Sequence, residues 1–426
     1  MQLSEKVYQY LDEVVAKTAQ DNPKWGEVFK KCFLNTLETT VKINDDGTVF
    51  VLTGDIPAMW LRDSTAQVRP YLLLAAMDQQ IADIIAGLVE QQFRYIIHDP
   101  YANAFNRTAD GSGHQDDHTD MTPMIWERKY EIDSLCFPIQ LAYLLYKNTG
   151  RTDHFNATFV DGVTAIVNLW IVEQDHTQSP YTFVRDTDRE EDTLINEGRG
   201  SQVAVTGMTW SGFRPSDDRC EYHYLVPSNM FAVVVLDYLV ELADVAKLPS
   251  ELVEKIQTLR SEIQVGIEAH AIVEDKAGNQ VFAYEVDGLG NYSLTDDPNV
   301  PSLLSLPYLG YCSEDDPVYQ ATRRLIFSHE NPYYYEGTYA SGLGSSHTWD
   351  QYIWPIALSM EGLTTSDRAK KRQLLDTLVN TDGGTYLMHE SFDVNDPTKY
   401  TREWFSWANM MFCELVLDYY GQQVKR

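Results

Sequence analysis

The sequence predicts an all-α fold, a toroid of six inner and six outer helices with small β-hairpin insertions. Clusters of polar and aromatic residues recur along the 426-residue chain, and each leads into an apolar helix. Six such units average about 70 residues, enough for an inner helix, an outer helix and two connections. Helix capping alone does not explain a tryptophan in nearly every cluster, so the inner helices are expected to begin around one pocket. The clusters occupy residues 60–63, 126–133, 216–228, 296–302, 346–350 and 389–404.

The periodic segments predict the individual helices in chain order. The first two cover 4–17 and 23–40, and Asp21 or Asn22 before Pro23 marks the start of the second. A hairpin should follow, with 44–47 as its turn, and a second hairpin-like piece spans 282–288. Ser228 is a candidate cap for the helix that follows it. Two further helices are expected to end at 77 and at 148. Others are expected over 79–97, 153–173, 228–247, 250–272, 316–329, 348–360, 366–380 and 402–420.

Composition indicates one continuous domain, 1–426, and restricts the partners. No Ser/Gly-rich, Pro-rich or charge-block segment divides the chain. The formal net charge is -30, so the protein repels polyanions, and neither nucleic acid nor an acidic membrane surface is an expected partner. The substrate should be neutral or cationic. Aromatic residues make up 12% of the chain, and rings beside carboxylates are typical of sugar sites.

The cysteines and the first residues predict a cytoplasmic protein. Five cysteines lie far apart without a CxxC pair, which is typical of reduced, buried thiols. The N-terminal segment has no apolar signal core, and no run reaches the roughly 20 apolar residues that cross a bilayer.

The stretch 209–229 is the strongest candidate for chemistry. Adjacent carboxylates, Asp217 and Asp218, lie in a segment without an apolar period and with four large aromatic side chains. A solvated turn is the alternative, since Pro-Ser-Asp-Asp suits a turn by itself. Such turns seldom carry so many rings, which favours a functional loop.

The remaining motifs favour carboxylate chemistry over metal or cofactor chemistry. Residues 99–124 contain two histidines among several aspartates, but no pair has the i, i+4 spacing of zinc motifs, and a hydrogen-bonding loop is expected. No nucleophile elbow, phosphate loop or dinucleotide fingerprint occurs. Paired carboxylates acting on an acetal are the common solution for glycoside hydrolysis. One partner is Asp217 or Asp218, because a close like charge raises a carboxyl pKa, and Glu390 is the best remote candidate.

Six stretches together resemble one known family over nearly the whole chain. They are Met59–Ser64, Trp126–Cys136, Trp210–Asp218, Tyr224–Ala232, Asn299–Leu304 and Met388–Phe392. The chain resembles glycoside hydrolase family 125, the exo-α-1,6-mannosidases. This resemblance implies an (α/α)6 barrel, no metal or other cofactor, and an oligosaccharide substrate whose terminal α-1,6-linked mannose is released with inversion.

The resemblance also implies roles for particular residues. Asp218 would be the general acid and Glu390 the general base, and the choice between Asp217 and Asp218 is the less secure half of this assignment. Inversion requires the two carboxyls to lie roughly 6.5 to 9.5 Å apart, with a water between them. The terminal mannose would be bound by Arg62, Asp63, Asp133 and His347, with Trp60, Trp126 and Trp349 as walls and Glu127 and Arg128 beside them.

Two other classes of function remain open. The same toroid suits a lyase or a metal-dependent mannosidase, and chelation would inactivate the latter. A non-catalytic glycan-binding protein is the second alternative. The many carboxylates favour an enzyme, because a neutral sugar can be bound with fewer buried charges, each costly to desolvate.

Overall fold

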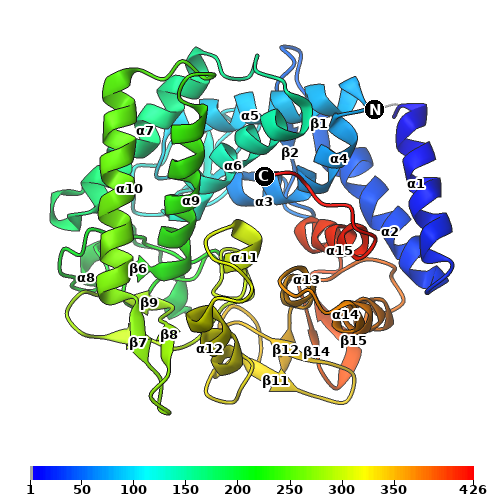
Figure 1. Cartoon of the computed structure of the whole chain (residues 1–426). Coiled ribbons are helices and arrows are strands. Elements are labelled where there is room, and N and C mark those ends of the chain that lie inside the picture. Colours follow the sequence, from blue (N-terminus) through cyan, green and yellow to red (C-terminus); the bar gives the residue numbers. More distant parts are fainter. Residues whose placement is uncertain (1–2) are drawn as a thin grey trace.

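The computed structural model describes residues 3–426, and helices dominate it (Figure 1). The helices are α1 Glu5–Thr18, α2 Pro23–Asn35, α3 Leu61–Val68, α4 Leu72–Ala75, α5 Gln79–His98, α6 Ile132–Thr149, α7 Ala157–Glu173, α8 Ile195–Gly198, α9 Val226–Leu242, α10 Ser250–His270, α11 Leu306–Leu309, α12 Pro317–Ile326, α13 Pro355–Leu363, α14 Arg368–Asn380 and α15 Ser406–Tyr419.

The strands form small antiparallel sheets of two or three strands. β1 Val41–Ile43 pairs with β2 Val49–Val51, and β7 Ile272–Glu274 pairs with β8 Gln280–Phe282. The others group as β3 Met59–Trp60 with β4 Ala104–Phe105 and β5 Ile125–Glu127; β6 Tyr224–Leu225 with β9 Glu285–Val286 and β10 Tyr292–Ser293; β11 Tyr334–Glu336 with β12 Ser341–Leu343; and β13 Tyr352–Ile353 with β14 Ser391–Asp393 and β15 Asp396–Thr401.

The helices divide into a central set and a surrounding set. In the centre, α3 packs against α6 and α15, α6 against α9, α9 against α11, and α15 against α13. Around them, α2 packs on α15, α5 on α6, α10 on α9, and α14 on α13 and α15. The two sets alternate along the chain, and α6, α9, α13 and α15 each pack on an outer helix adjacent in this order, namely α5, α10 and α14.

Residue pattern explains which helices lie inside. A helix that is apolar all round must be buried on every side, whereas an amphipathic helix needs to cover only one stripe. Every residue of α15 is buried, as is most of α6 and α9. The outer helix α1 buries only a stripe that includes Val7, Leu11 and Val14.

Most of the expected helices and the first hairpin are confirmed, but several helix ends are wrong. The expected helix over 348–360 begins only at Pro355, because residues 352–353 pair as β13 with β14. The helix expected from 402 begins at Ser406 for a similar reason, since 396–401 forms β15. Ser228 is not a cap: α9 starts at Val226, and the Ser228 hydroxyl is buried without a partner.

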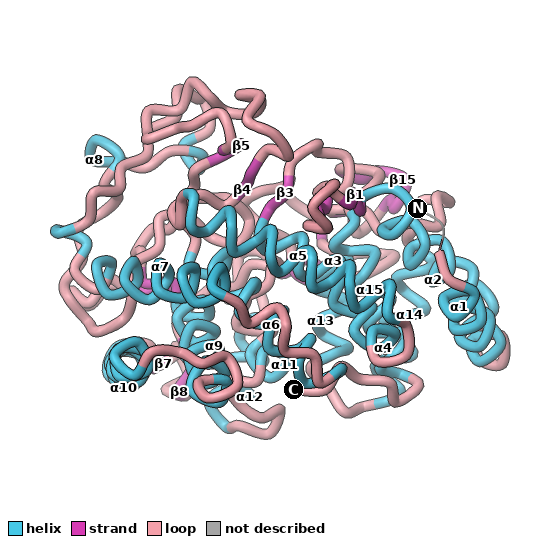
Figure 2. The backbone as a smooth tube through the Cα atoms, turned by 90° about the horizontal axis from the view of Figure 1, so that it is seen from above, coloured by secondary structure: helices cyan, strands magenta, loops and turns pink. Residues whose placement is uncertain are grey.

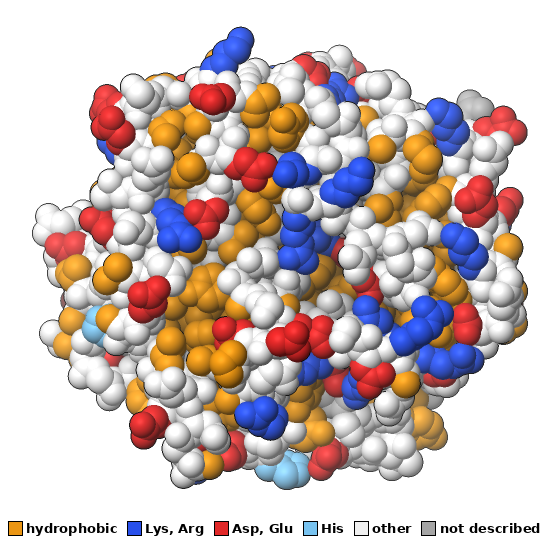
Figure 3. Space-filling model, in the orientation of Figure 1, with side chains coloured by type: hydrophobic (Ala, Val, Ile, Leu, Met, Phe, Trp, Pro, Cys, Tyr) orange, Lys and Arg blue, Asp and Glu red, His pale blue; other side chains and the backbone are white. Residues whose placement is uncertain are grey.

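The two sides of the helical layer differ. Figure 2 shows β3, β4 and β5 with their connecting loops along one side, and the C-terminus on the opposite side. Figure 3 shows the face with the C-terminus, where Lys and Arg side chains gather near the middle despite the acidic composition. No helix among residues 3–426 combines the length and hydropathy needed to span a bilayer.

Candidate active site

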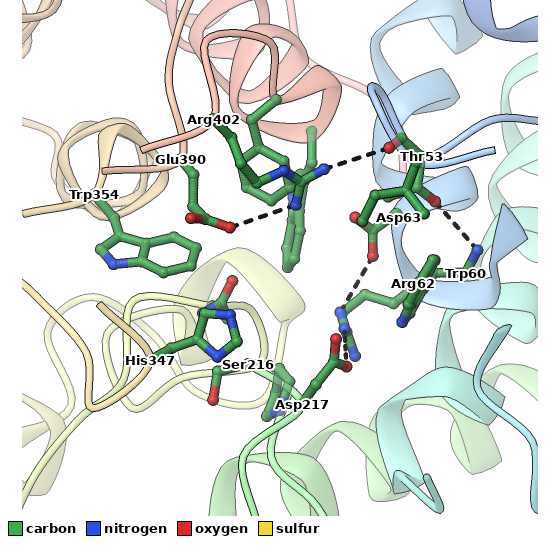
Figure 4. A pocket seen from close by; sticks show the side chains of 15 residues that line it. Thr53, Trp60, Arg62, Asp63, Ser216, Asp217, His347, Trp354, Glu390 and Arg402 are labelled. Atoms are coloured by element: carbon green, nitrogen blue, oxygen red, sulfur yellow. Dashed lines mark hydrogen bonds and ion pairs between the residues drawn. The ribbon is translucent and has the colours of Figure 1, made fainter. Parts of the chain in front are cut away.

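A cavity opens where several central helices begin (Figure 4). The start of α3, the loop before β6, the segment before α11, and the segments before α13 and α15 all contribute side chains. The lining residues are Thr53, Ile56, Trp60, Arg62, Asp63, Pro215, Ser216, Asp217, Asn299, His347, Trp354, Glu390, Arg402, Phe405 and Trp407. The expected convergence of polar helix starts on one pocket is therefore present for these segments.

A tight turn presents Asp217 to the cavity. The amide of Asp217 donates to the carbonyl of Arg214 (2.9 Å), and the amide of Arg214 donates to the carbonyl of Asp218 (2.7 Å). Asp217 adopts a left-handed backbone, φ 66°, which aspartate tolerates better than most residues. Arg214 fixes the turn through Glu285, at 2.5 Å. The Asp217 side chain is consequently 24% exposed, whereas that of Asp218 is fully buried.

Arg62 lies at the centre of an acidic cluster. This guanidinium, on the first turn of α3, is within 3.5 Å of four carboxyl groups. They belong to Glu131 (2.6 Å), Asp133 and Asp217 (3.1 Å each) and Asp63 (3.5 Å). We call Arg62 and these four acids the Arg62 cluster.

Burial shapes the protonation of this cluster. Burial raises the pKa of Asp63 and of Asp133 to about 6, although Arg62 opposes the rise in both cases. Asp217 behaves differently: burial would raise its pKa, but Arg62, Glu131 and Lys129 outweigh that effect and lower it. The charge of Asp217 is therefore stabilised, whereas the charges of Asp63 and Asp133 are not.

Asp218 lies behind the cavity wall, where hydrogen-bond donors offset the burial of its charge. Its carboxylate accepts hydrogen bonds from Arg189 (2.7 Å), Ser346 (2.7 Å) and His347 (2.9 Å). Burial alone would raise its pKa, but these partners lower it to about 2. Burial likewise disfavours charged His347, yet the bond to Asp218 dominates and raises the histidine pKa. Asp218 therefore anchors the ring of His347 at the cavity edge and favours its protonated form.

Glu390 faces the cavity from the opposite side, at the start of β14 (Figure 4). Its neighbours hold it firmly: the Ser391 amide bonds the Thr401 hydroxyl (3.1 Å), and the Met388 amide bonds the Asn409 side chain (2.7 Å). Arg402 approaches one carboxylate oxygen at 3.4 Å and also pairs with Asp55. A carboxyl group that faces the cavity is positioned to take a proton from water.

Aromatic side chains complete the lining. Trp60, Trp354, Phe405 and Trp407 supply flat apolar surface of the kind that packs on sugar faces. The indole nitrogen of Trp60 is buried without a hydrogen-bond partner within the described chain. The cavity thus combines carboxyls, cations and rings.

The predicted site residues are only partly brought together. Trp60, Arg62, Asp63, His347 and Glu390 line the cavity, together with Asp217, the open alternative to Asp218. Six predicted residues lie outside the lining: Asp218, Trp126, Glu127, Arg128, Asp133 and Trp349.

Contacts explain several of these positions. Arg128 bonds Asp99 (2.7 Å) and Thr119 (2.8 Å), and Glu127 is bound by Arg185 (2.8 Å), so both have structural partners. Asp133 is buried under Arg62. Trp126 packs against the small buried cluster of Ala58, Trp60 and Ala104, and Trp349 is 66% exposed.

Sequence reasoning missed some lining residues and one partner. Trp354, Phe405 and Trp407 were not singled out, although each falls within an expected central helix; in the structure each adjoins the start of α13 or α15. Arg189 lies in an acidic segment with no motif, and only its contact with Asp218 reveals it.

The loop over 99–124 is hydrogen-bonded, as expected. Asp117 receives both ends of the Arg185 guanidinium at 2.7 Å, and the Asn106 side chain bonds two carbonyls of the loop at 2.9 and 3.0 Å. Across residues 3–426, no group of three or more His, Cys, Asp or Glu is arranged to hold a metal ion.

Comparison with known proteins gives consistent matches. The family model for metal-independent alpha-mannosidase (GH125) matches residues 22–417. The meiotically up-regulated gene 157 protein of Schizosaccharomyces pombe is 38% identical over 97% of this chain and 86% of its own length. A solved Streptococcus pneumoniae structure, from a family of metal-independent alpha mannosidases, holds α-1,6-mannobiose in a non-productive complex. It is 60% identical, with a TM-score of 0.98 over 99% of this chain and 100% of that one.

A more distant structure resembles the chain only in its fold. A glycosidase solved with glucose is 12% identical, with a TM-score of 0.55 over 93% of this chain and 97% of that one.

Proposed function

Because the chain belongs to the family of metal-independent α-mannosidases, GH125, we propose that it removes a terminal α-1,6-linked mannose from an oligosaccharide, with inversion. The linkage is supported by the 60% identical Streptococcus pneumoniae protein, which was solved with α-1,6-mannobiose. The observation that carries the mechanism is the placement of Asp217 and Glu390 in one cavity, on segments 173 residues apart in sequence.

We assign the general acid to Asp217 and the general base to Glu390. Asp217 protonates the glycosidic oxygen as the bond to the anomeric carbon breaks, and Glu390 takes a proton from the water that attacks the opposite face. Asp217 is favoured over Asp218 because it faces the cavity, whereas Asp218 is buried and fully engaged by Arg189, Ser346 and His347. The two catalytic carboxyls should lie roughly 6.5 to 9.5 Å apart.

The other lining groups would bind and orient the mannose. Arg62, Asp63 and His347 offer charged hydrogen-bonding groups, and Trp60 offers an aromatic surface. Asp218 acts indirectly, by fixing His347. Glu127, Arg128 and Asp133 would support this shell from behind, and Trp126 would buttress Trp60. Trp349 would contact only the part of a longer glycan that extends from the cavity.

We extend the proposal to architecture and location. The alternation of α2, α5, α7, α10, α12 and α14 with α3, α6, α9, α11, α13 and α15 supports a single (α/α)6 catalytic domain over 1–426. A reducing cytoplasm suits the five free thiols, four of them buried.

Proton NMR of the reaction with α-1,6-mannobiose tests the function. Early β-mannose, before mutarotation, is the expected product of inversion. Early α-mannose would mean retention and a nucleophile other than the groups assigned here. Absence of turnover, with undiminished binding of the disaccharide, would indicate a glycan-binding protein instead.

A further inference from the structure

Glu131 lies inside the Arg62 cluster and has no part in the reaction assigned above. It immediately precedes α6 and is only 1% exposed. One of its oxygens, Oε2, accepts from Arg62 (2.6 Å) and from the Ser134 hydroxyl (2.7 Å). The other, Oε1, is buried and has no partner among the groups that donate in the described chain. A buried carboxyl oxygen without a donor is a natural position for a proton.

Charge balance requires that the Arg62 cluster retain protons. One guanidinium contacts four carboxyl groups, so full ionisation would leave more negative charge than Arg62 alone can balance. Three further cations act on single members of the cluster, Lys129 and His347 on Asp217 and Arg402 on Asp63. Lys129 already bonds Asp192 (3.0 Å) and the Asp217 carbonyl (2.7 Å) and lies 3.8 Å from Glu127. None of these three cations contacts Glu131 within the described chain.

The groups around Glu131 identify where one proton resides. Arg62 from α3, Asp133 from α6 and Asp217 from the catalytic turn act on Glu131. Lys129 acts on Asp217 and lies 3.8 Å from Glu127. Burial raises the pKa of Glu131 well above its usual range, and the charges of Asp217 and Asp133 raise it further against the pull of Arg62. Glu131 and Asp217 both contact the Arg62 guanidinium, at 2.6 and 3.1 Å. The pKa of Glu131 is raised whereas that of Asp217 is lowered, so the proton of this pair belongs to Glu131.

We propose that Glu131 is a positioning residue that shares one proton with Asp217 and thereby keeps the general acid protonated for each turnover. The inference rests on the proposed function, in which Asp217 is that acid. When a sugar displaces water from Asp217, the shared proton moves from Glu131 to Asp217, and Glu131 becomes a carboxylate paired with Arg62. Asp217 passes the proton to the glycosidic oxygen, which keeps the electron pair of the broken bond.

The proton balance closes after product release. Attacking water gives its hydroxyl to the anomeric carbon and one proton to Glu390. That proton leaves to solvent, and the Glu131–Asp217 pair takes up one proton again. No further reactant is needed.

The test uses two substrates that differ in their need for an acid. α-1,6-Mannobiose has a sugar alcohol as leaving group and needs protonation, whereas α-mannosyl fluoride releases fluoride with far less assistance. Glu131→Gln keeps the shape and can still donate to Asp217, but it cannot lose a proton. We expect kcat/KM for mannobiose to fall by about 10² to 10³-fold and that for the fluoride by less than about tenfold.

Two further readouts separate proton sharing from a structural role. The alkaline limb of the kcat/KM profile for mannobiose should move to lower pH in Glu131→Gln, because Asp217 alone beside Arg62 ionises more readily. Glu131→Asp should retain more mannobiose activity than Glu131→Gln, although glutamine is the closer match in shape. Equal losses on both substrates, an unmoved limb, or a glutamine variant more active than the aspartate variant would each overturn the proposal.

Glu173→Gln is the matched control. Glu173 is also fully buried and accepts from Tyr101 (2.7 Å), but it does not line the cavity. This variant should leave the ratio of the two activities at the wild-type value.

The remaining outcomes are also decisive. If Glu131→Gln does not fold, Glu131→Asp decides: selective loss on mannobiose with a shifted alkaline limb supports proton sharing, and equal losses exclude it. If Asp217→Asn retains full mannobiose activity, the assignment of the acid fails instead, which is distinguishable from a failure confined to Glu131.

Discussion

Asp217 and Asp218 are adjacent in the chain but occupy opposite electrostatic environments. Asp218 has three hydrogen-bond donors for its one charge, and its pKa falls to about 2. Asp217 shares a single guanidinium with three other acids. The pKa of both aspartates is lowered, but Asp218 has donors of its own, whereas Asp217 depends on a cation that three other acids share. The difference teaches that a carboxylate with its own donors is a permanent charge, whereas a group of acids around one cation retains a proton among its members.

The largest expected effect is a loss of catalytic activity that is greater for substitution of Asp217 than for substitution of Asp218. Asp217→Asn removes the proton donor and should lower kcat/KM for α-1,6-mannobiose by about 10² to 10⁴-fold, as should Glu390→Gln. Steady-state kinetics with both variants measure this. Asp218→Asn, the matched neighbour, should lose clearly less, because only the anchoring of His347 and Arg189 is weakened. The reverse order would return the acid to Asp218.

Removal of the Arg62 guanidinium should destabilise the Arg62 cluster, which is the environment of Asp217. Arg62→Met leaves four buried carboxyls without their guanidinium and should lower the free energy of unfolding by about 3 to 5 kcal/mol at pH 7. Denaturant titration at pH 7 and pH 5 measures it. Protonation should restore part of the stability at pH 5, and a loss independent of pH would contradict this account.

The pH dependence of stability should have opposite signs at the two positions. The folded pKa of Asp218 lies below its unfolded value, so its contribution of roughly 2 kcal/mol is present above about pH 4 and is lost towards pH 2. Asp218→Asn should flatten the curve of unfolding free energy there. The pKa of Asp63 is raised to about 6, so its destabilising effect grows as pH rises from about 4 to 6. The unfolding free energy should therefore fall over this range in the wild type, and Asp63→Asn should reduce that fall. An unchanged curve in either variant would disprove the assignment.

The smallest effect on activity is expected at Trp349, which belongs to neither the Asp217 nor the Asp218 environment. Trp349 is largely exposed and does not line the cavity, so Trp349→Ala should change kcat/KM for mannobiose by less than about threefold. A longer α-1,6-linked mannooligosaccharide should show a larger KM increase than the disaccharide. A large loss on the disaccharide would place Trp349 in the cavity when substrate is bound.

The sequence indicated the helical architecture well because it depends on local pattern. Apolar residues on all sides of 406–419 and a single apolar stripe on 5–18 are visible in the chain itself, and they separate central from outer helices. Helix starts near Pro355 and Ser406 were misplaced, because their preceding residues pair with strands far away in sequence.

The candidate site was predicted less completely. The recurring clusters located Trp60, Arg62, Asp63, His347 and Glu390 in the cavity, since each cluster lies at the start of a central helix. Arg128 and Glu127 belong to the same kind of cluster, yet both are bound by partners outside the cavity, Asp99 and Arg185. Residue type and position near a helix start do not determine the direction of a side chain.

By itself, the sequence determined that paired carboxylates, cations and rings would gather where central helices begin. Only the tertiary structure decided that Asp217 faces the cavity and Asp218 lies behind it, because a left-handed residue in a tight turn sends neighbouring side chains in different directions. It also decided that Arg62 meets acids from three separate segments. Proton affinities depend on distances and burial in three dimensions, and local sequence contains neither.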